Sequence, residues 1–138
     1  MATANRAPET AQAVALAFKS LGVRNLFGIP GGGSSVDLIE ACAAEGIPFI
    51  LVQHETSAAI MALVSGELTD SCGACISIMG PGATNLAAGA TYAYLERHPL
   101  LCITECYGPV SAPLMSIQKI DHPGLFAPFS KGSVAIDQ

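Results

Sequence analysis

Glu55 is the residue of this sequence best placed for acid–base chemistry. It comes three residues after the end of the apolar run Phe49–Val52, and Ala58 and Ala59 come soon after it. A carboxylate among apolar neighbours is held away from bulk water and can share a proton with a bound ligand. The alternative is a solvated glutamate that the positive end of a helix dipole stabilises.

Two glycine-rich turns contain further candidates for ligand binding. Their sequences are GIPGGG at residues 28–33 and GPGATN at residues 80–85. Such turns let a ligand approach the backbone closely, or they simply turn the chain. Each matches the G-x-G-x-x-G fingerprint of dinucleotide binding only in part, because Pro30 replaces the second glycine and Asn85 replaces the last. Glu55 lies about where a ribose-binding acid would fall, so a dinucleotide-binding module stays open.

The elements before and after these segments must position them. Apolar runs predict strands, and apolar stripes at helical spacing predict helices. The expected strands are Asn25–Ile29, Phe49–Gln53, Gly73–Met79, Leu100–Thr104 and a short last one, Gly132–Ile136. Two expected helices are Pro8–Leu21 and Thr56–Leu68. Another starts at Ser34, in a capping box with Asp37, and ends at Gly46. The last is capped by Thr84 or Asn85 and runs to Leu95. The proline-rich stretch Tyr107–Pro128 is expected to be irregular.

Strands that alternate with helices of this length predict a parallel sheet with helices on both faces. The fold class is therefore α/β, a three-layer sandwich with a mainly parallel sheet in a single domain. In such sheets, ligands bind beyond the carboxyl ends of the strands. Glu55 and both glycine-rich turns follow strands, so we expect them to lie at one edge of the sheet.

Composition excludes several classes of function. The 138 residues are 51% hydrophobic and 12% charged, which excludes a disordered chain, and the net charge of -5 argues against nucleic acid as a partner. The uncharged run Ser71–Leu95 is long enough for a membrane span, but Gly80, Pro81 and Gly82 interrupt it. We therefore expect a soluble, cytoplasmic protein that does not enter a membrane.

The five cysteines cannot form a complete disulfide framework within one chain, because their number is odd. Cys72 and Cys75 have CxxC spacing, but Cys75 enters an apolar run and no second pair of zinc ligands accompanies them. We expect buried free thiols and no metal site made by this chain alone.

Taken together, the segments GIPG (28–31), HETSA (54–58), GPGATN (80–85) and PLL (99–101) resemble the pyrimidine-binding domain of thiamine diphosphate enzymes. Within that superfamily the chain is most similar to the group of acetolactate synthase, pyruvate oxidase and oxalyl-CoA decarboxylase. The resemblance runs from about Ala11 to Ile136, so it implies that residues 1–138 form one thiamine diphosphate-binding domain.

The resemblance implies a role for each matching residue. Glu55 corresponds to the catalytic glutamate, which binds the aminopyrimidine ring and, by sharing its proton, favours the imino form. The imino nitrogen then deprotonates the thiazolium carbon, and the resulting ylid attacks a 2-keto acid. Pro30 corresponds to the residue that lies against the pyrimidine, and Gly82 and Asn85 fall on the turn beside the cofactor. Gln118 falls where some carboligases place a glutamine near the substrate channel.

Other features of the family pattern are missing. The sequence has no GDG motif for the diphosphate and Mg²⁺, and it lacks the central and diphosphate-binding domains. A complete site would therefore need a homo- or hetero-oligomer in which a diphosphate-binding subunit supplies the Mg²⁺ site. After the glutamate, Val64, Gly66 and Glu67 stand where the family has Gly, Ala and Arg, on a helix that packs at the subunit interface. The chain also stops just after Ile136, which suggests a C-terminal truncation with an exposed sheet edge.

Three hypotheses follow from the sequence. The chain is a subunit of a split decarboxylase or carboligase for 2-keto acids, a truncated remnant that catalyses nothing, or a dinucleotide-binding module. The first rests on the segments around Glu55, the second on the missing elements, and the third on the turn at residues 28–33.

Overall fold

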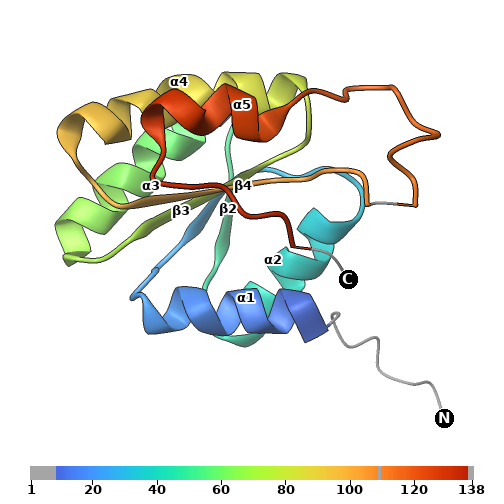
Figure 1. The fold of residues 1–138 in the computed structure, drawn as a ribbon. Coiled ribbons are helices and arrows are strands. Elements are labelled where there is room, and N and C mark those ends of the chain that lie inside the picture. The colour runs from blue at the N-terminus through green and yellow to red at the C-terminus, as the bar shows by residue number, and fades with distance from the viewer. Residues whose placement is uncertain (1–8, 109, 137–138) are drawn as a thin grey trace, which may run out of the picture.

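Four parallel strands form the central sheet of the computed structural model, which describes residues 9–108 and 110–136 (Figure 1). The strands are β1 (Leu26–Ile29), β2 (Phe49–Leu51), β3 (Gly73–Ser77) and β4 (Leu100–Thr104), in the order β2-β1-β3-β4. Leu26 pairs with Phe49 on one side and with Ala74 on the other, and Cys75 pairs with Cys102. The parallel sheet predicted from the sequence is confirmed.

Helices cover both faces of the sheet, as a three-layer sandwich requires. On one face lie α1 (Glu9–Ser20) and α2 (Ser34–Ala44), which Figure 1 shows below the sheet. On the other face lie α3 (Glu55–Thr69) and α4 (Pro81–Glu96), together with α5 (His122–Phe126) and the 3-10 turn η1 (Ala127–Phe129). The predicted fold class is therefore confirmed.

The core consists of two separate clusters, one on each face of the sheet. Successive strand residues point to opposite faces, so Leu26 packs toward α1 and α2, whereas Phe27 packs toward α3 and α4. Small residues let α3 and α4 approach closely: a Cβ atom at Gly89 would lie 2.5 Å from the Cβ of Ala59. In the sheet, a side chain at Gly28 would overlap the carbonyl oxygen of Ile76. Close packing rather than large side chains holds the layers together.

The predicted capping box at Ser34 is wrong. Gly33 is the N-cap residue of α2, and no side chain of the N-cap makes a hydrogen bond there. The Ser35 N–H instead donates to Oε1 of Glu105, at 3.0 Å. A carboxylate from the end of β4 thus replaces the local cap.

Helix α4 begins three residues before the predicted cap. Gly80, with a φ of 66°, is its N-cap residue, and Pro81 occupies the first turn, where its fixed φ suits a helix start. Thr84 does not cap the helix, because its hydroxyl donates to the Pro81 carbonyl inside the first turn, at 2.8 Å. Asn85 lies within the helix and is free to point toward Glu55.

The C-terminal region also differs from the prediction. Residues 132–136 form no strand, and the described residues contain only the four strands named above. Part of the stretch expected to be irregular forms α5 and η1, because Asp121 caps α5 by accepting the Gly124 N–H at 3.0 Å.

The five cysteines are all free thiols, as predicted, but only two of them are buried. Cys42 and Cys75 lie in the core, Cys72 and Cys102 are half-buried, and Cys106 is exposed. Burial raises the pKa of Cys42 to about 11.

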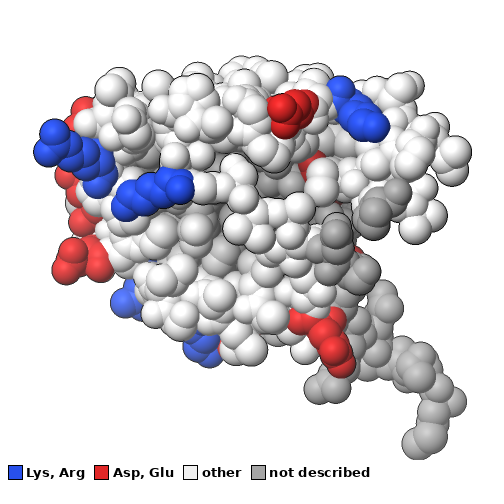
Figure 2. Space-filling model, viewed as in Figure 1, with Lys and Arg blue, Asp and Glu red and all other residues white. Residues whose placement is uncertain are grey.

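Charged groups are sparse on the surface, in keeping with the composition. On the face shown in Figure 2, the charged side chains lie mostly toward the rim of the molecule, and the area between them is largely uncharged. Among the residues that the structure describes, no helix combines the length and apolar character that crossing a membrane requires.

Candidate functional site

Glu55 is the first residue of α3 and lies at the edge of the sheet where the strands end. Its side chain is 7% exposed, although His54 and Gln53 before it are exposed. His54 is the N-cap residue, and its Nδ1 accepts the Thr56 N–H at 3.2 Å. The helix start therefore holds the Glu55 carboxylate in a buried position.

Asn85 of α4 binds this carboxylate directly. Its side-chain Nδ2 donates to Glu55 Oε2 at 3.0 Å, and the Thr56 hydroxyl donates to the Asn85 carbonyl at 2.6 Å. These two hydrogen bonds join the first turns of α3 and α4. The protein itself therefore binds Oε2 of Glu55 rather than Oε1.

Gly82 lies beside the other oxygen of Glu55, where a larger residue would not fit. A Cβ atom at Gly82 would lie 3.2 Å from Glu55 Oε1 and 2.7 Å from Cγ2 of Ile78. Gly82 and Asn85 are three residues apart on α4, so they share one face of the helix. Glu55, Gly82 and Asn85 thus form a small polar cluster, which we call the carboxylate cluster.

Pro30 follows β1 at the same edge of the sheet. Because β1 pairs with both β2 and β3, the loop after β1 lies between the ends of the strands that lead to Glu55 and Gly82. Pro30 is half-buried. The sheet therefore brings all three predicted segments to one edge.

Comparison with known proteins agrees with this arrangement. The profile of the family described as "Thiamine pyrophosphate enzyme, N-terminal TPP binding domain" matches residues 8–123. The chain belongs to the thiamine pyrophosphate enzyme family. The match includes Pro30 and the whole carboxylate cluster, so the resemblance inferred from the sequence is confirmed.

Similar proteins within the family include large subunits of acetolactate synthase. The chain is 36% identical over 129 residues to "Acetolactate synthase isozyme 2 large subunit" of Escherichia coli, an alignment that covers 91% of this chain and 23% of that protein. It is 35% identical to "Probable acetolactate synthase large subunit" of Methanocaldococcus jannaschii, over 91% of this chain and 21% of that protein. It is 38% identical to "Acetolactate synthase large subunit" of Lactococcus lactis, over 87% of this chain and 21% of that protein. The chain spans about a fifth of the length of these relatives.

The carboxylate cluster fits the aminopyrimidine ring of the thiamine cofactor that this family binds. The ring offers an amino group and ring nitrogens, and Glu55 offers one oxygen, Oε1, on the side where Gly82 has no side chain. The second oxygen is already held by Asn85. A buried carboxylate that has one oxygen bound by Asn85 can offer its other oxygen to such a ring.

Gln118 lies outside the carboxylate cluster, in the loop between β4 and α5. Its backbone has a φ of 56°, its side chain is exposed, and its carbonyl packs against Gly80 so closely that a Cβ there would overlap it. Gln118 also lines a pocket of about 180 Å³ together with His122 and Lys119. Gln118, the predicted substrate residue, therefore lies against Gly80 at the start of α4, and Gly80 is two residues before Gly82. The role of Gln118 stays a prediction.

The sequence analysis missed two residues at this edge, Glu105 and His122. Glu105 is 8% exposed; its Oε1 accepts the Ser35 N–H, and its Oε2 fills the space that a side chain at Gly31 would need. Glu105 follows the strand Leu100–Thr104, so the rule that identified Glu55 could have found it too.

His122 connects three segments. Its Nε2 accepts the Gly80 N–H at 3.1 Å, and its Nδ1 lies 3.3 Å from the Thr104 hydroxyl. Because Nε2 is an acceptor, the proton of the neutral ring is on Nδ1, which donates to Thr104. Burial lowers the pKa of His122, and the nearby charge of Asp121 offsets part of that effect. The proline-rich stretch Tyr107–Pro128 contains no sequence pattern that predicts these contacts of His122.

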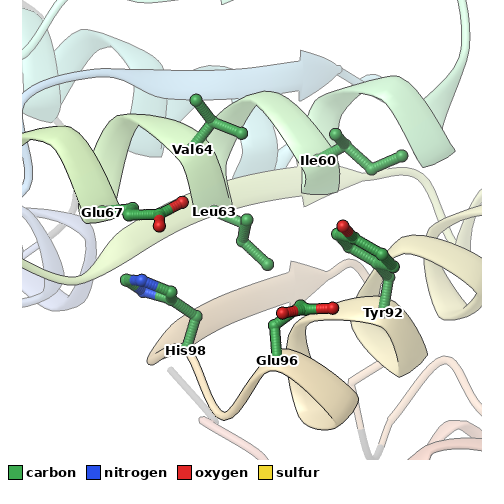
Figure 3. A pocket seen from close by; sticks show the side chains of 7 residues that line it. All are labelled: Ile60, Leu63, Val64, Glu67, Tyr92, Glu96 and His98. Carbon is green, nitrogen blue, oxygen red and sulfur yellow. The ribbon is translucent and has the colours of Figure 1, made fainter.

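A separate hollow lies between the outer faces of α3 and α4. It is a groove of about 590 Å³ in which Ile60, Leu63, Val64 and Glu67 of α3 face Tyr92 and Glu96 of α4, with His98 beyond (Figure 3). No described group of three or more His, Cys, Asp or Glu residues could hold a metal ion, there or at the carboxylate cluster.

Proposed function

We propose that this chain provides the pyrimidine-binding half of a thiamine diphosphate site in a decarboxylase or carboligase that acts on 2-keto acids. The observation that carries the proposal is the buried Glu55 carboxylate, with Oε2 bound by Asn85 and Oε1 beside Gly82. Acetolactate synthases among the relatives supply the reaction class.

Each residue of the cluster has a task in this proposal. Thiamine diphosphate, when bound, supplies the carbanion chemistry that 2-keto acids need. Glu55 holds and moves a proton at Oε1, toward the pyrimidine. Asn85 prevents Glu55 from turning away, and Gly82 lets the ring approach. Pro30 borders the ring from the β1 side, and Gln118 borders the substrate.

A partner is part of the proposal, as a homo- or hetero-oligomer with a subunit that binds the diphosphate. Mg²⁺ would be bound there, because this sequence has no GDG motif. The outer face of α3 and α4 supports a docking role, since Ile60, Met61, Val64, Leu68 and Tyr92 are all more than a third exposed. The cytoplasmic location expected from the sequence remains a prediction.

A dinucleotide at the turn of residues 28–33 is disfavoured by Glu105. Its carboxylate accepts the Ser35 N–H at the start of α2 and occupies the space beside Gly31. A diphosphate at that helix start would compete with an anion that is already bound. The helix start after this turn is therefore not available to a dinucleotide, and this argues for the cofactor of the family.

The test begins with the native complex from the cells that make this protein. Native mass measurement is expected to show the chain with a diphosphate-binding subunit, and the complex is expected to turn over a 2-keto acid such as pyruvate. Glu55→Gln is expected to lower kcat by about 100-fold or more, because the amide cannot take up or release the proton.

Glu40→Gln is the matched control. Glu40 is an exposed carboxylate on α2, on the opposite face of the sheet, so the rate should not change. Full activity of the Glu55→Gln complex would refute the assignment of Glu55. A chain that always purifies without a diphosphate-binding partner and never turns over a 2-keto acid would support the non-catalytic alternative.

A further inference from the structure

Cys75 and Cys102 form a pair of thiols that the proposed function does not use. They are direct partners in the register of β3 and β4, and their Sγ atoms lie 3.7 Å apart. Neighbouring parallel strands are about 4.8 Å apart, which is within the Cα separation of about 4.4–6.8 Å found in disulfides. The backbone is therefore already placed for a covalent bond between these two sulfurs.

The surroundings of the pair distinguish it from the other cysteines. Both side chains point to the face of the sheet that α3 and α4 cover, and Cys75 is fully buried there. Cys102 is half-buried on β4, which is an edge strand, so it is the sulfur that a small oxidant can reach. The Cys75 thiol donates to Cys102, and this hydrogen bond and burial raise the pKa of Cys75.

We propose that Cys75 and Cys102 are a redox site, at which a peroxide closes a disulfide that clamps the edge strand β4 to β3. In the first step, the Cys102 sulfur takes an oxygen atom from hydrogen peroxide, which gives a sulfenic acid and one water. In the second step, the Cys75 sulfur attacks the Cys102 sulfur; the S–S bond forms, the S–O bond breaks, and a second water leaves. A dithiol reverses the reaction by thiol exchange.

The bond would act on the carboxyl edge of the sheet through β4. Thr104, which binds His122, and Glu105, which binds the Ser35 N–H, follow Cys102 by two and three residues. The disulfide would also limit the unfolded chain, because it closes the loop of residues 75–102. The oxidised protein is therefore expected to resist unfolding more than the reduced one.

The test uses the whole chain, oxidised with hydrogen peroxide and then unfolded and labelled with a thiol-alkylating reagent. We expect Cys75 and Cys102 to escape labelling, the peptides that contain them to be joined, and dithiothreitol to restore both. Cys102→Ser should remove the cross-link and Cys106→Ser should keep it, so the exposed cysteine serves as the control. The urea midpoint should rise on oxidation of the wild type and not of Cys102→Ser.

Two results would overturn the proposal. One is full labelling of Cys75 and Cys102 under conditions in which Cys106 is completely oxidised, because the geometry would then not lead to a bond. The other is a mapped disulfide that joins a different pair, such as Cys72 and Cys102. If Cys75→Ser does not fold, Cys102→Ser at the edge of the sheet still decides the question.

Discussion

Two buried carboxylates at the same edge of the sheet have different surroundings, and these decide what each can do. Glu105 has Oε1 bound by the Ser35 N–H, and its Oε2 lies against Gly31. Glu55 has Oε2 bound by the Asn85 side chain, and its Oε1 lies beside Gly82. Glu105 therefore ties the end of β4 to the start of α2, whereas Glu55 is the carboxylate that we propose for proton exchange with the cofactor.

At the same scale, His122 makes the stability of the fold depend on pH. Burial lowers the pKa of His122 below that of the unfolded chain, about 6.5, so the unfolded state binds more protons as the pH falls. Its contribution to stability is fully present above about pH 6.5 and is lost as the pH falls through the lowered pKa. The protonated ring could not accept the Gly80 N–H.

Urea unfolding between about pH 7.5 and about pH 5 measures this effect. The midpoint is expected to fall toward acid pH in the wild type and to fall less in His122→Gln, because the glutamine oxygen can accept the same N–H without titrating. Identical pH profiles for wild type and His122→Gln would contradict this account.

At the scale of elements, the contact between α3 and α4 depends on residues without bulk. Gly89→Ala would bring a Cβ atom to 2.5 Å from the Cβ of Ala59, so the helices must separate. We expect a loss of about 1–3 kcal/mol of unfolding free energy, although alanine favours helix formation. Gly32→Ala, which meets nothing within 4 Å, should change stability by less than about 0.5 kcal/mol. Equal urea midpoints for the two variants would show that the helices can give way.

The elements also show what the sequence can and cannot predict. The strand Leu100–Thr104 is predicted to the residue, because an apolar run between Pro99 and Glu105 has clear ends. The start of α2 at Ser34 is predicted, but its capping box is not formed, because the Ser35 N–H is bound by Glu105, 70 residues away, which no local pattern reveals. The last expected strand, Gly132–Ile136, does not form, and these residues pair with neither edge strand, β2 or β4.

For the site, the sequence predicts the residues better than their contacts. Glu55, Gly82 and Asn85 follow from strand ends and the family resemblance, and the structure brings them together. The hydrogen bond of Asn85 to Glu55 required α4 to begin at Pro81 rather than at Thr84 or Asn85. The sequence allows Asn85 either to cap the helix or to lie inside it and point toward Glu55. Only the fold decides between these two positions.

At the scale of the whole molecule, several exposed apolar side chains lie on the outer face of α3 and α4, among them Ile60, Val64 and Tyr92. The groove between these helices contains Glu67 and Glu96, and Val64 lies at its rim with 41% of its surface exposed. Val64→Asp is expected to weaken assembly with the diphosphate-binding subunit and to leave the circular dichroism spectrum of the chain unchanged. Native mass measurement of the complex checks this expectation.

Leu16→Asp is the control for that variant. Leu16 is 53% exposed on α1, on the other side of the sheet, so a charge there should not affect assembly. If both variants assemble like the wild type, the partner docks on another surface.

Gly28 and Gly89 have a consequence at the level of the gene. A side chain at Gly28 would overlap the Ile76 carbonyl, and one at Gly89 would meet Ala59. Every base change at the first or second position of a glycine codon that still encodes an amino acid introduces a larger one, whereas third-position changes are silent. In a randomly mutated gene selected for a folded product, these two codons should therefore change at their third base more often than at their first or second.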